Sequence, residues 1–317
     1  SGVVSATAGA TTPDQTGTGI TVTAATQPAN SLAPQGASRV PFTTFTLTNN
    51  SGAPVTVTGV TVQRTGLAAD AAFSGIVLVD SNGLQVGVSR TFDSNHMATI
   101  GDTMTLAAGA SQTFTVAGNI GSSVSAYTGQ VAALTVTGIN TSATVTGSLP
   151  ITGAQQTINS TLTLGTVTVS NSSFDPISAQ TKNIGDTGIK FSGVRFTAGS
   201  AEDVKFYSLR WRVNGSAAPS DFANVMTIVN GTSYQTAVSA DGRFYTTVFP
   251  GGILIQKGNS VDAYVQGDIV GTNASGRNIG FDIDRTSDVY FVGQTYGYGI
   301  SLSTTSFGIS YTSALSL

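Results

Sequence analysis

Three aspartates form the group in this sequence whose spacing most suggests chemistry. Asp282 and Asp284 are two residues apart, so in a strand both side chains point to the same face. Two like charges on one face repel each other unless something neutralises them. A Ca²⁺ ion could do so, with Asp288 adding a ligand from the next turn, and so could Arg285. The pattern predicts either a calcium site or a solvated, arginine-paired strand face.

A second group consists of aromatic side chains that follow these aspartates. Tyr290, Tyr296 and Tyr298 could stack on pyranose rings and form a sugar-binding platform. The alternative is that the same rings pack in a core or an interface, which is what aromatic side chains mostly do. Residues 296–299 alternate tyrosine and glycine, a pattern that also fits a turn whose rings cover the glycines.

The inventory for catalysis is poor. The one histidine, His96, lies in a predicted turn, and the one glutamate, Glu202, lies at a predicted hairpin tip as a solvated charge. The sequence has no nucleophile elbow, dinucleotide fingerprint or phosphate-binding loop. We therefore expect no enzymatic activity, no catalytic residue and, apart from calcium, no cofactor.

The composition excludes further classes of protein. Only 9% of the 317 residues are charged, and 13 Lys and Arg with a net charge of -3 argue against nucleic-acid binding. The absence of cysteine excludes disulfides and thiolate metal sites. No apolar run is long enough for a membrane-spanning helix. Enrichment in Ser, Thr and Gly with few charges suits an extracellular, cell-surface protein.

The elements that must position these residues are strands. Apolar residues alternate with threonine along most of the chain, and turn signals such as Asn230-Gly231 and Asp241-Gly242 separate the runs. Helical periodicity is limited to one short turn within 67–73 and another within 217–224. The pattern predicts an all-β protein of antiparallel β-sandwiches, either immunoglobulin-like or jelly-roll-like.

The two halves of the chain align with each other. Residues 41–79 match 190–228 without a gap, so that Phe42 pairs with Phe191 and Val62 with Trp211, each 149 residues apart. We infer an internal duplication with one sandwich in 18–157 and a second in 164–317. In both copies the apolar register slips by one residue, which predicts a β-bulge or a tight bend at Gly59 and at Ser208.

The first 17 residues precede the first repeat and are mostly small. A segment with so little apolar side chain gains order mainly through backbone hydrogen bonds, as a strand added to the edge of a sheet. We therefore predict that residues 1–17 form an exchanged strand that contacts another copy, with 307–317 as the alternative exchanged element. The candidate partner-binding residues are Ser1, Val3, Val4, Ala6 and Ala8.

The repeat resembles a known group of proteins. Val55–Gly66 followed by 70–74, and 282–288 leading to 296–299, resemble the secreted, surface-layer-like tandem β-sandwich repeat proteins of environmental bacteria. The resemblance implies an extracellular structural role and carries over no catalytic residue. The expected function is a non-enzymatic, self-assembling subunit of a cell-surface filament or surface-layer-like lattice, whose partners are other copies of itself. The alternative is a carbohydrate-binding or adhesive module that binds cell-surface glycans.

Overall fold

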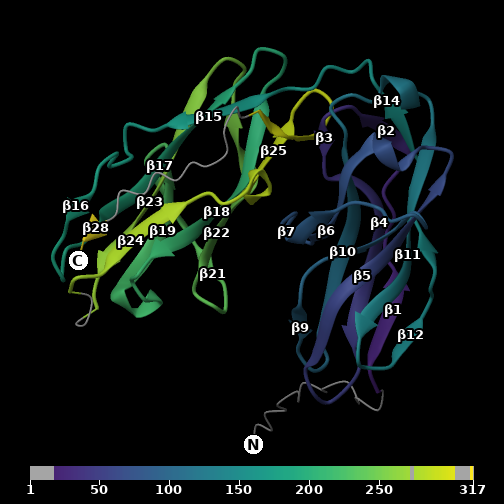
Figure 1. The fold of residues 1–317 in the computed structure, drawn as a ribbon, viewed down its shortest axis with the longest axis horizontal. Coiled ribbons are helices and arrows are strands. Elements are labelled where there is room, and N and C mark those ends of the chain that lie inside the picture. Colours follow the sequence, from purple (N-terminus) through teal and green to yellow (C-terminus); the bar gives the residue numbers. More distant parts are fainter. Residues whose placement is uncertain (1–17, 272–274, 304–314, 317) are drawn as a thin grey trace, which may run out of the picture.

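The computed structural model describes residues 18–271, 275–303 and 315–316. Within these ranges the chain is almost entirely β-strand, which confirms the predicted all-β class. Figure 1 shows two β-sandwiches side by side, joined at one end so that the molecule forms an arch. No helix among the described residues is long and apolar enough to cross a membrane.

The first sandwich consists of two facing sheets. One sheet has the strand order β12 (Val145–Gly147), β1 (Ile20–Ala24), β4 (Val40–Asn49), β10 (Ser111–Ile120), β6 (Phe73–Asp80) and β7 (Gln85–Arg90). The other sheet has the order β2 (Ser31–Pro34), β14 (Gln156–Asn159), β11 (Val131–Thr141), β5 (Val55–Gly66) and β8 (Met97–Ile100), with β13 (Ile151–Thr152) on β11 and β9 (Met104–Leu106) on β5.

The second sandwich repeats this plan. One sheet has the order β20 (Thr232–Gln235), β19 (Phe222–Val229), β23 (Ser260–Ile269), β17 (Ile189–Ala198), β15 (Val167–Asn171) and β27 (Leu302–Ser303). The other contains β16 (Gln180–Thr181), β28 (Leu315–Ser316), β24 (Asn278–Asp282), β18 (Val204–Gly215), β25 (Val289–Gly293) and β26 (Gly299–Ile300), with β22 (Phe244–Ile255) and β21 (Ala237–Val238) beside β18. Short 3₁₀ turns are η1 (Asp70–Ala72), η2 (Ser125–Tyr127), η3 (Pro219–Asp221) and η4 (Thr286–Asp288).

Strand bounds in the two halves differ by the offset found in the sequence. Adding 149 to the bounds of β4, β5, β6 and β10 gives those of β17, β18, β19 and β23, and η1 maps onto η3 in the same way. The two predicted helical turns are thereby confirmed. A common origin by duplication, and the boundaries at 18–157 and 164–317, stay predictions.

The matched core positions are buried in both halves. Phe42 and Val62 lie in the first core, and Phe191 and Trp211 lie in the second, each at 1% exposure or less. The second core is the more aromatic one, with rings such as Phe206 packed against several others. Because packing alternates along a strand, the apolar face of each strand faces inward and its polar face faces out.

The predicted bulges are present, one residue earlier than expected. The pairing of β5 with β11 skips Thr58, and the pairing of β18 with β22 and β25 skips Tyr207. The hairpin between β19 and β20 turns at Asn230 and Gly231, whose φ values of 50° and 77° are the left-handed pair that a tight hairpin requires. The bulges and the hairpin turn fix the register in which these strands pair.

The outer faces of corresponding strands carry different chemistry. On the first sandwich Thr46 of β4 shares a hydrogen bond of 2.8 Å with Thr113 of β10. At the corresponding positions of the second sandwich Arg195 forms an ion pair with Asp262. The first sandwich therefore has a pair of threonine hydroxyls where the second sandwich has an ion pair. This is one instance of the threonine-rich exterior of the first half.

Candidate functional site at the junction of the two sandwiches

The junction begins with a strand pairing between the halves. β3 (Ala37–Ser38), which precedes the long strand β4, pairs antiparallel with β26 and so extends a sheet of the second sandwich. Gly299 permits the approach, because a Cβ there would lie 2.3 Å from the Ser38 carbonyl oxygen. The Ser301 hydroxyl donates a hydrogen bond to the Gly36 carbonyl at 3.2 Å. A short segment from the first half of the chain therefore forms the edge strand of a sheet of the second sandwich.

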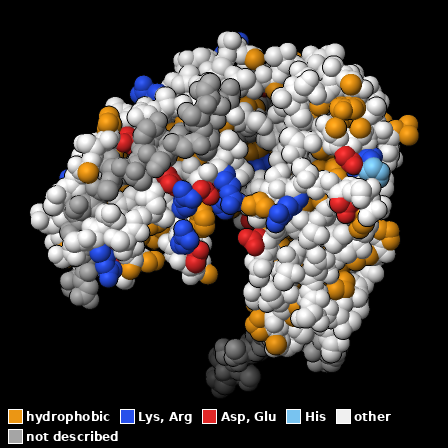
Figure 2. All heavy atoms as spheres, in the orientation of Figure 1, with side chains coloured by type: hydrophobic (Ala, Val, Ile, Leu, Met, Phe, Trp, Pro, Cys, Tyr) orange, Lys and Arg blue, Asp and Glu red, His pale blue; other side chains and the backbone are white. Residues whose placement is uncertain are grey.

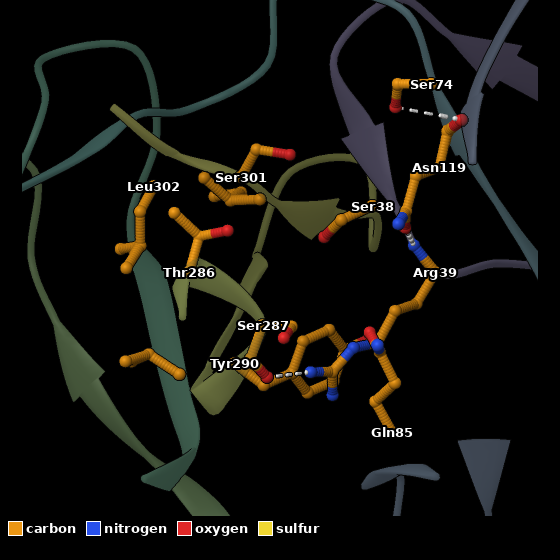
Figure 3. Close-up of a pocket in the computed structure, with 12 residues that line it drawn as sticks. Ser38, Arg39, Ser74, Gln85, Asn119, Thr286, Ser287, Tyr290, Ser301 and Leu302 are labelled. Atoms are coloured by element: carbon orange, nitrogen blue, oxygen red, sulfur yellow. Dashed lines mark hydrogen bonds between the residues drawn. The ribbon is translucent and has the colours of Figure 1, made fainter. Parts of the chain in front are cut away.

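Arg39, next in the chain, locks this pairing (Figure 3). Its backbone N–H donates to Asn119 Oδ1 at 2.8 Å, and its guanidinium Nη1 donates to the Gly83 carbonyl at 2.6 Å. Nη2 donates across the junction to the Ser287 carbonyl at 2.7 Å. The guanidinium carbon lies 4.2 Å from the centre of the Tyr290 ring, a cation–π contact. One side chain from the first sandwich thus joins backbone and ring of the second.

The backbone of Arg39 adopts a conformation that is energetically unfavourable for any residue with a side chain. Its φ of 53° is left-handed, a conformation that costs a non-glycine residue about 1–2 kcal/mol. The corresponding residue of the second half, 149 positions on, is Gly188 with a φ of 63°. Glycine is the ordinary choice at such a position. Arginine in its place is explained by the contacts that its guanidinium makes across the junction.

Burial perturbs the ionisable groups of the junction. Desolvation lowers the pKa of Arg39, although Tyr290, Asp288 and Asp80 oppose the shift. Burial also raises the pKa of Tyr290, so its hydroxyl is neutral at physiological pH. Arg39 is only 8% exposed, and two carbonyls and one ring surround its charge. Groups from both halves of the chain therefore hold this one charge.

We call the contacts that Arg39 makes with Gly83, Ser287 and Tyr290 the clamp. Cavities lie beside it. One of about 180 Å³ lies against the β3–β26 pairing, and Figure 3 shows the side chains that line it, among them Ser38, Asn119 and Thr286. A second, of about 350 Å³, lies on the side of Tyr290 and Tyr298. Both take lining residues from the two sandwiches, so neither exists in one half alone.

A row of ion pairs continues from the junction along β18. Strand alternation places Arg210 and Arg212 on the outer face, opposite the buried Trp211. Arg210 Nε donates to Asp288 Oδ1 at 2.8 Å, and Arg212 donates to both oxygens of Asp282 at 2.9 and 2.8 Å. Figure 2 shows charged side chains gathered over this part of the second sandwich, beside the hollow of the arch.

The three aspartates of the predicted calcium site all lie in this row. Asp282 and Asp284 both contact Arg212, so they share a face as expected, and Arg285 reaches Asp284 at 3.3 Å. Burial raises the pKa of Asp288, against the opposing effect of Arg210. In the described ranges no group of three His, Cys, Asp or Glu side chains is arranged to hold a metal ion. Arginine supplies the positive charge here, and calcium binding stays a prediction.

The three tyrosines of the predicted sugar platform are divided. Tyr290 lies beneath Arg39, and Tyr298 is half-buried against the core of the first sandwich. Both line the cavity of about 350 Å³. Tyr296 is 46% exposed and lies outside that lining. The structure therefore brings two of the three rings together, at the interface.

The other candidate charges have structural partners. His96 lies in a turn, as predicted, and its Nδ1 is 2.6 Å from Asp70 Oδ2. The prediction of a solvated Glu202 is wrong, because this side chain is 3% exposed. Glu202 accepts hydrogen bonds from the N–H groups of Gly165 at 2.7 Å and Thr295 at 2.8 Å. Its side chain fits there because the neighbouring glycines have no Cβ atom. These charges tie loops together.

Asp70 makes the stability of the first sandwich dependent on pH. Burial raises its pKa, but hydrogen bonds from Arg64 and His96 outweigh burial, so the pKa lies below its usual value. A depressed carboxylate pKa stabilises the fold above the unfolded pKa of about 3.9, and this stability is lost as pH falls through the folded pKa. We expect Asp70→Asn to flatten the acid limb of stability below about pH 4 in denaturant titrations. The control Asp102→Asn, at an exposed carboxylate, should keep the wild-type slope; equal slopes for wild type and Asp70→Asn would contradict the prediction.

The predicted partner-binding residues Ser1, Val3, Val4, Ala6 and Ala8 lie outside the described residues. Arg39 was missed by sequence reasoning. Its one sequence signal is its alignment with Gly188, which marks a position that favours glycine.

Comparison with known proteins gives matches among solved structures alone, and all those named here have low TM-scores. No protein-family model and no curated protein matches the chain. Similar solved structures include the C-terminal domain of the antigen I/II-family protein AspA of Streptococcus pyogenes, with 9% identity over 90% of this chain and 98% of that chain, and a TM-score of 0.21. The serine-rich repeat adhesion glycoprotein Srr1 of Streptococcus agalactiae has 10% identity over 91% and 96%, with a TM-score of 0.18. The secreted serine protease VesC of Vibrio cholerae has 15% identity over 82% and 50%, with a TM-score of 0.20. Scores this low carry no argument about function.

Proposed function

We propose that this chain is a non-enzymatic, extracellular structural subunit that assembles with copies of itself into a cell-surface filament or lattice. The observation that carries the proposal is the junction. There, β3 of the first half extends a sheet of the second half, so the chain already links two sandwiches through strand pairing at a sheet edge. The same mode of linkage between copies would build a polymer.

The charges support a structural role. The buried carboxylates Asp282, Asp288 and Glu202 are all bonded to arginine or to backbone N–H groups. A general acid or base needs a carboxyl or imidazole that is within reach of a substrate and free to exchange a proton. Groups held in this way stabilise loops and strands, and they suit a subunit that must keep its shape.

The sheets offer edges for assembly. β20 ends a sheet of the second sandwich, and β7 ends the corresponding sheet of the first, where Gly87 and Val88 form isolated bridges to Gly101. An open edge presents unpaired backbone groups, which an added strand satisfies. We propose that residues 1–17, with Ser1, Val3, Val4, Ala6 and Ala8, supply that strand to a neighbouring copy.

Deleting residues 1–17 should leave a folded protein that does not polymerise. The reason is that the strands and core residues that the structure describes begin after residue 17, whereas the added strand would be lost. Negative-stain microscopy and light scattering would compare the full chain with the truncated chain, and circular dichroism would confirm an unchanged melting transition. A matched variant, in which a Gly/Ser segment of equal length replaces 1–17, should also stay monomeric. Normal polymers from either variant would contradict the exchanged-strand proposal, and a full chain that stays monomeric would contradict assembly itself.

A further inference from the structure

The cavity of about 350 Å³ at the junction has the makings of a binding site. It is lined by both halves of the chain, so its shape depends on the clamp described above. Its lining includes Arg39, Val79 and Asp80 of the first half and Tyr290 and Tyr298 of the second. A space of this size is at the lower end of ordinary small-molecule pockets.

One part of the lining is apolar. Val79 and Ala117, with Val77 beside them, form a small buried cluster of their own, separate from both sandwich cores. Alternation along β6 and β10 places these side chains on the outer face of the sheet, and Val79 and Ala117 line the cavity together with residues of the second half. Tyr290 and Tyr298 add two aromatic rings. Such surfaces suit the C–H faces of a sugar ring, which are apolar.

Another part of the lining accepts hydrogen bonds. Asp80 Oδ1 accepts the N–H groups of Asn82 and Leu84, each at 2.9 Å, and this fixes the carboxylate in the turn after β6. Within the described ranges no hydrogen bond is donated to Asp80 Oδ2. Ser81 and Thr115 contribute hydroxyls to the same lining. A carboxylate with one oxygen to spare is a strong acceptor for the hydroxyls of a ligand.

The two charges of the lining sum to zero. The guanidinium of Arg39 is committed to two carbonyls and the Tyr290 ring, so it offers an anion little. Asp80 carries the opposite charge, so an ion of either sign meets one attractive and one repulsive group in the lining. A neutral ligand with several hydroxyls avoids this opposition and can still donate hydrogen bonds to Asp80.

We propose that this cavity binds one ring of a neutral glycan, with Tyr290 and Tyr298 against the ring and Asp80 accepting its hydroxyls. The proposal goes beyond self-assembly and does not depend on it. It would give a surface protein a glycan contact at the joint between its sandwiches. It keeps Tyr290 and Tyr298 of the sugar platform expected from sequence and leaves out Tyr296.

Isothermal titration of the full chain with glucose, galactose, mannose, N-acetylglucosamine and their homo-oligosaccharides tests the proposal. We expect saturable binding of at least one of these with a Kd of about 1 mM or lower. Asp80→Asn keeps an oxygen for the turn but removes the charged acceptor, and it should weaken binding about tenfold or more. Tyr298→Leu keeps apolar packing, loses the ring, and should weaken binding similarly. The matched control Tyr296→Ala should stay within about twofold of wild type.

Two results would overturn the proposal. These are no saturable binding of any probe, or binding that Tyr296→Ala abolishes while Asp80→Asn and Tyr298→Leu leave it intact. Thermal melting of each variant checks that the junction still folds. Light scattering of the same samples reports assembly separately, so failure of glycan binding and failure of self-assembly can be told apart.

Discussion

Trp211→Ala is expected to lower the free energy of unfolding of the second sandwich by about 3–5 kcal/mol. Trp211 is 1% exposed and lies on β18, in the core of the second sandwich. Truncation removes a large apolar surface and leaves a cavity. It also removes the indole N–H that donates to Thr227 Oγ1 at 3.0 Å, a hydroxyl that in turn pairs with Thr247 at 2.7 Å. A buried hydroxyl pair then loses a partner.

Trp211 is the only tryptophan, so the variant has no tryptophan fluorescence with which to follow unfolding. Calorimetry therefore measures this change. In the wild type that fluorescence reports on the second sandwich alone. The control Trp211→Phe keeps most of the volume and should cost clearly less than alanine. Val62→Ala, at the matched position of the first sandwich, should instead destabilise that half. A loss below about 1 kcal/mol for Trp211→Ala would mean that Trp211 is not a core residue.

Arg212→Met is expected to cost about 3 kcal/mol, the lower end of the range for breaking a buried ion pair. Asp282 is 5% exposed and has both oxygens bonded to Arg212, while Asn214 donates one further hydrogen bond at 2.8 Å. Without Arg212 the carboxylate stays buried next to Asp284 with no guanidinium partner. Arg212 itself is about a third exposed, so water relieves part of the penalty.

Denaturant unfolding of the single variant and of Arg212→Met with Asp282→Leu measures this effect. The double variant removes the orphaned charge and should recover much of the lost stability. A double variant no more stable than Arg212→Met would contradict the ion-pair account. Excess chelator decides the calcium alternative: with arginine as the neutralising group the wild-type melting transition stays unchanged, whereas a lower transition would establish a bound ion.

The sequence determined the strands, their turns and the repeat. Two examples are the alternation of apolar residues with threonine in β5 and the Asn230-Gly231 turn. Both depend on residues that are neighbours in the chain, so they can be predicted without knowledge of the fold. The spacing of 149 residues likewise placed Phe191 and Trp211 in a core. The shared face of Asp282 and Asp284 followed from the strand period. Each of these depends on the backbone geometry of a few consecutive residues.

Only the tertiary structure decided what those side chains meet. Arg39 and Ser287 are 248 residues apart, and nothing in the local pattern of either indicates their hydrogen bond. Glu202 and Thr295 are 93 apart, and their contact turned an expected solvated charge into a buried one. Sequence period fixes the face on which a side chain lies, whereas its partner depends on how two separate sheets pack and how the halves join. The arginine partners of the aspartates, the clamp and the cavity beside it all belong to that second level.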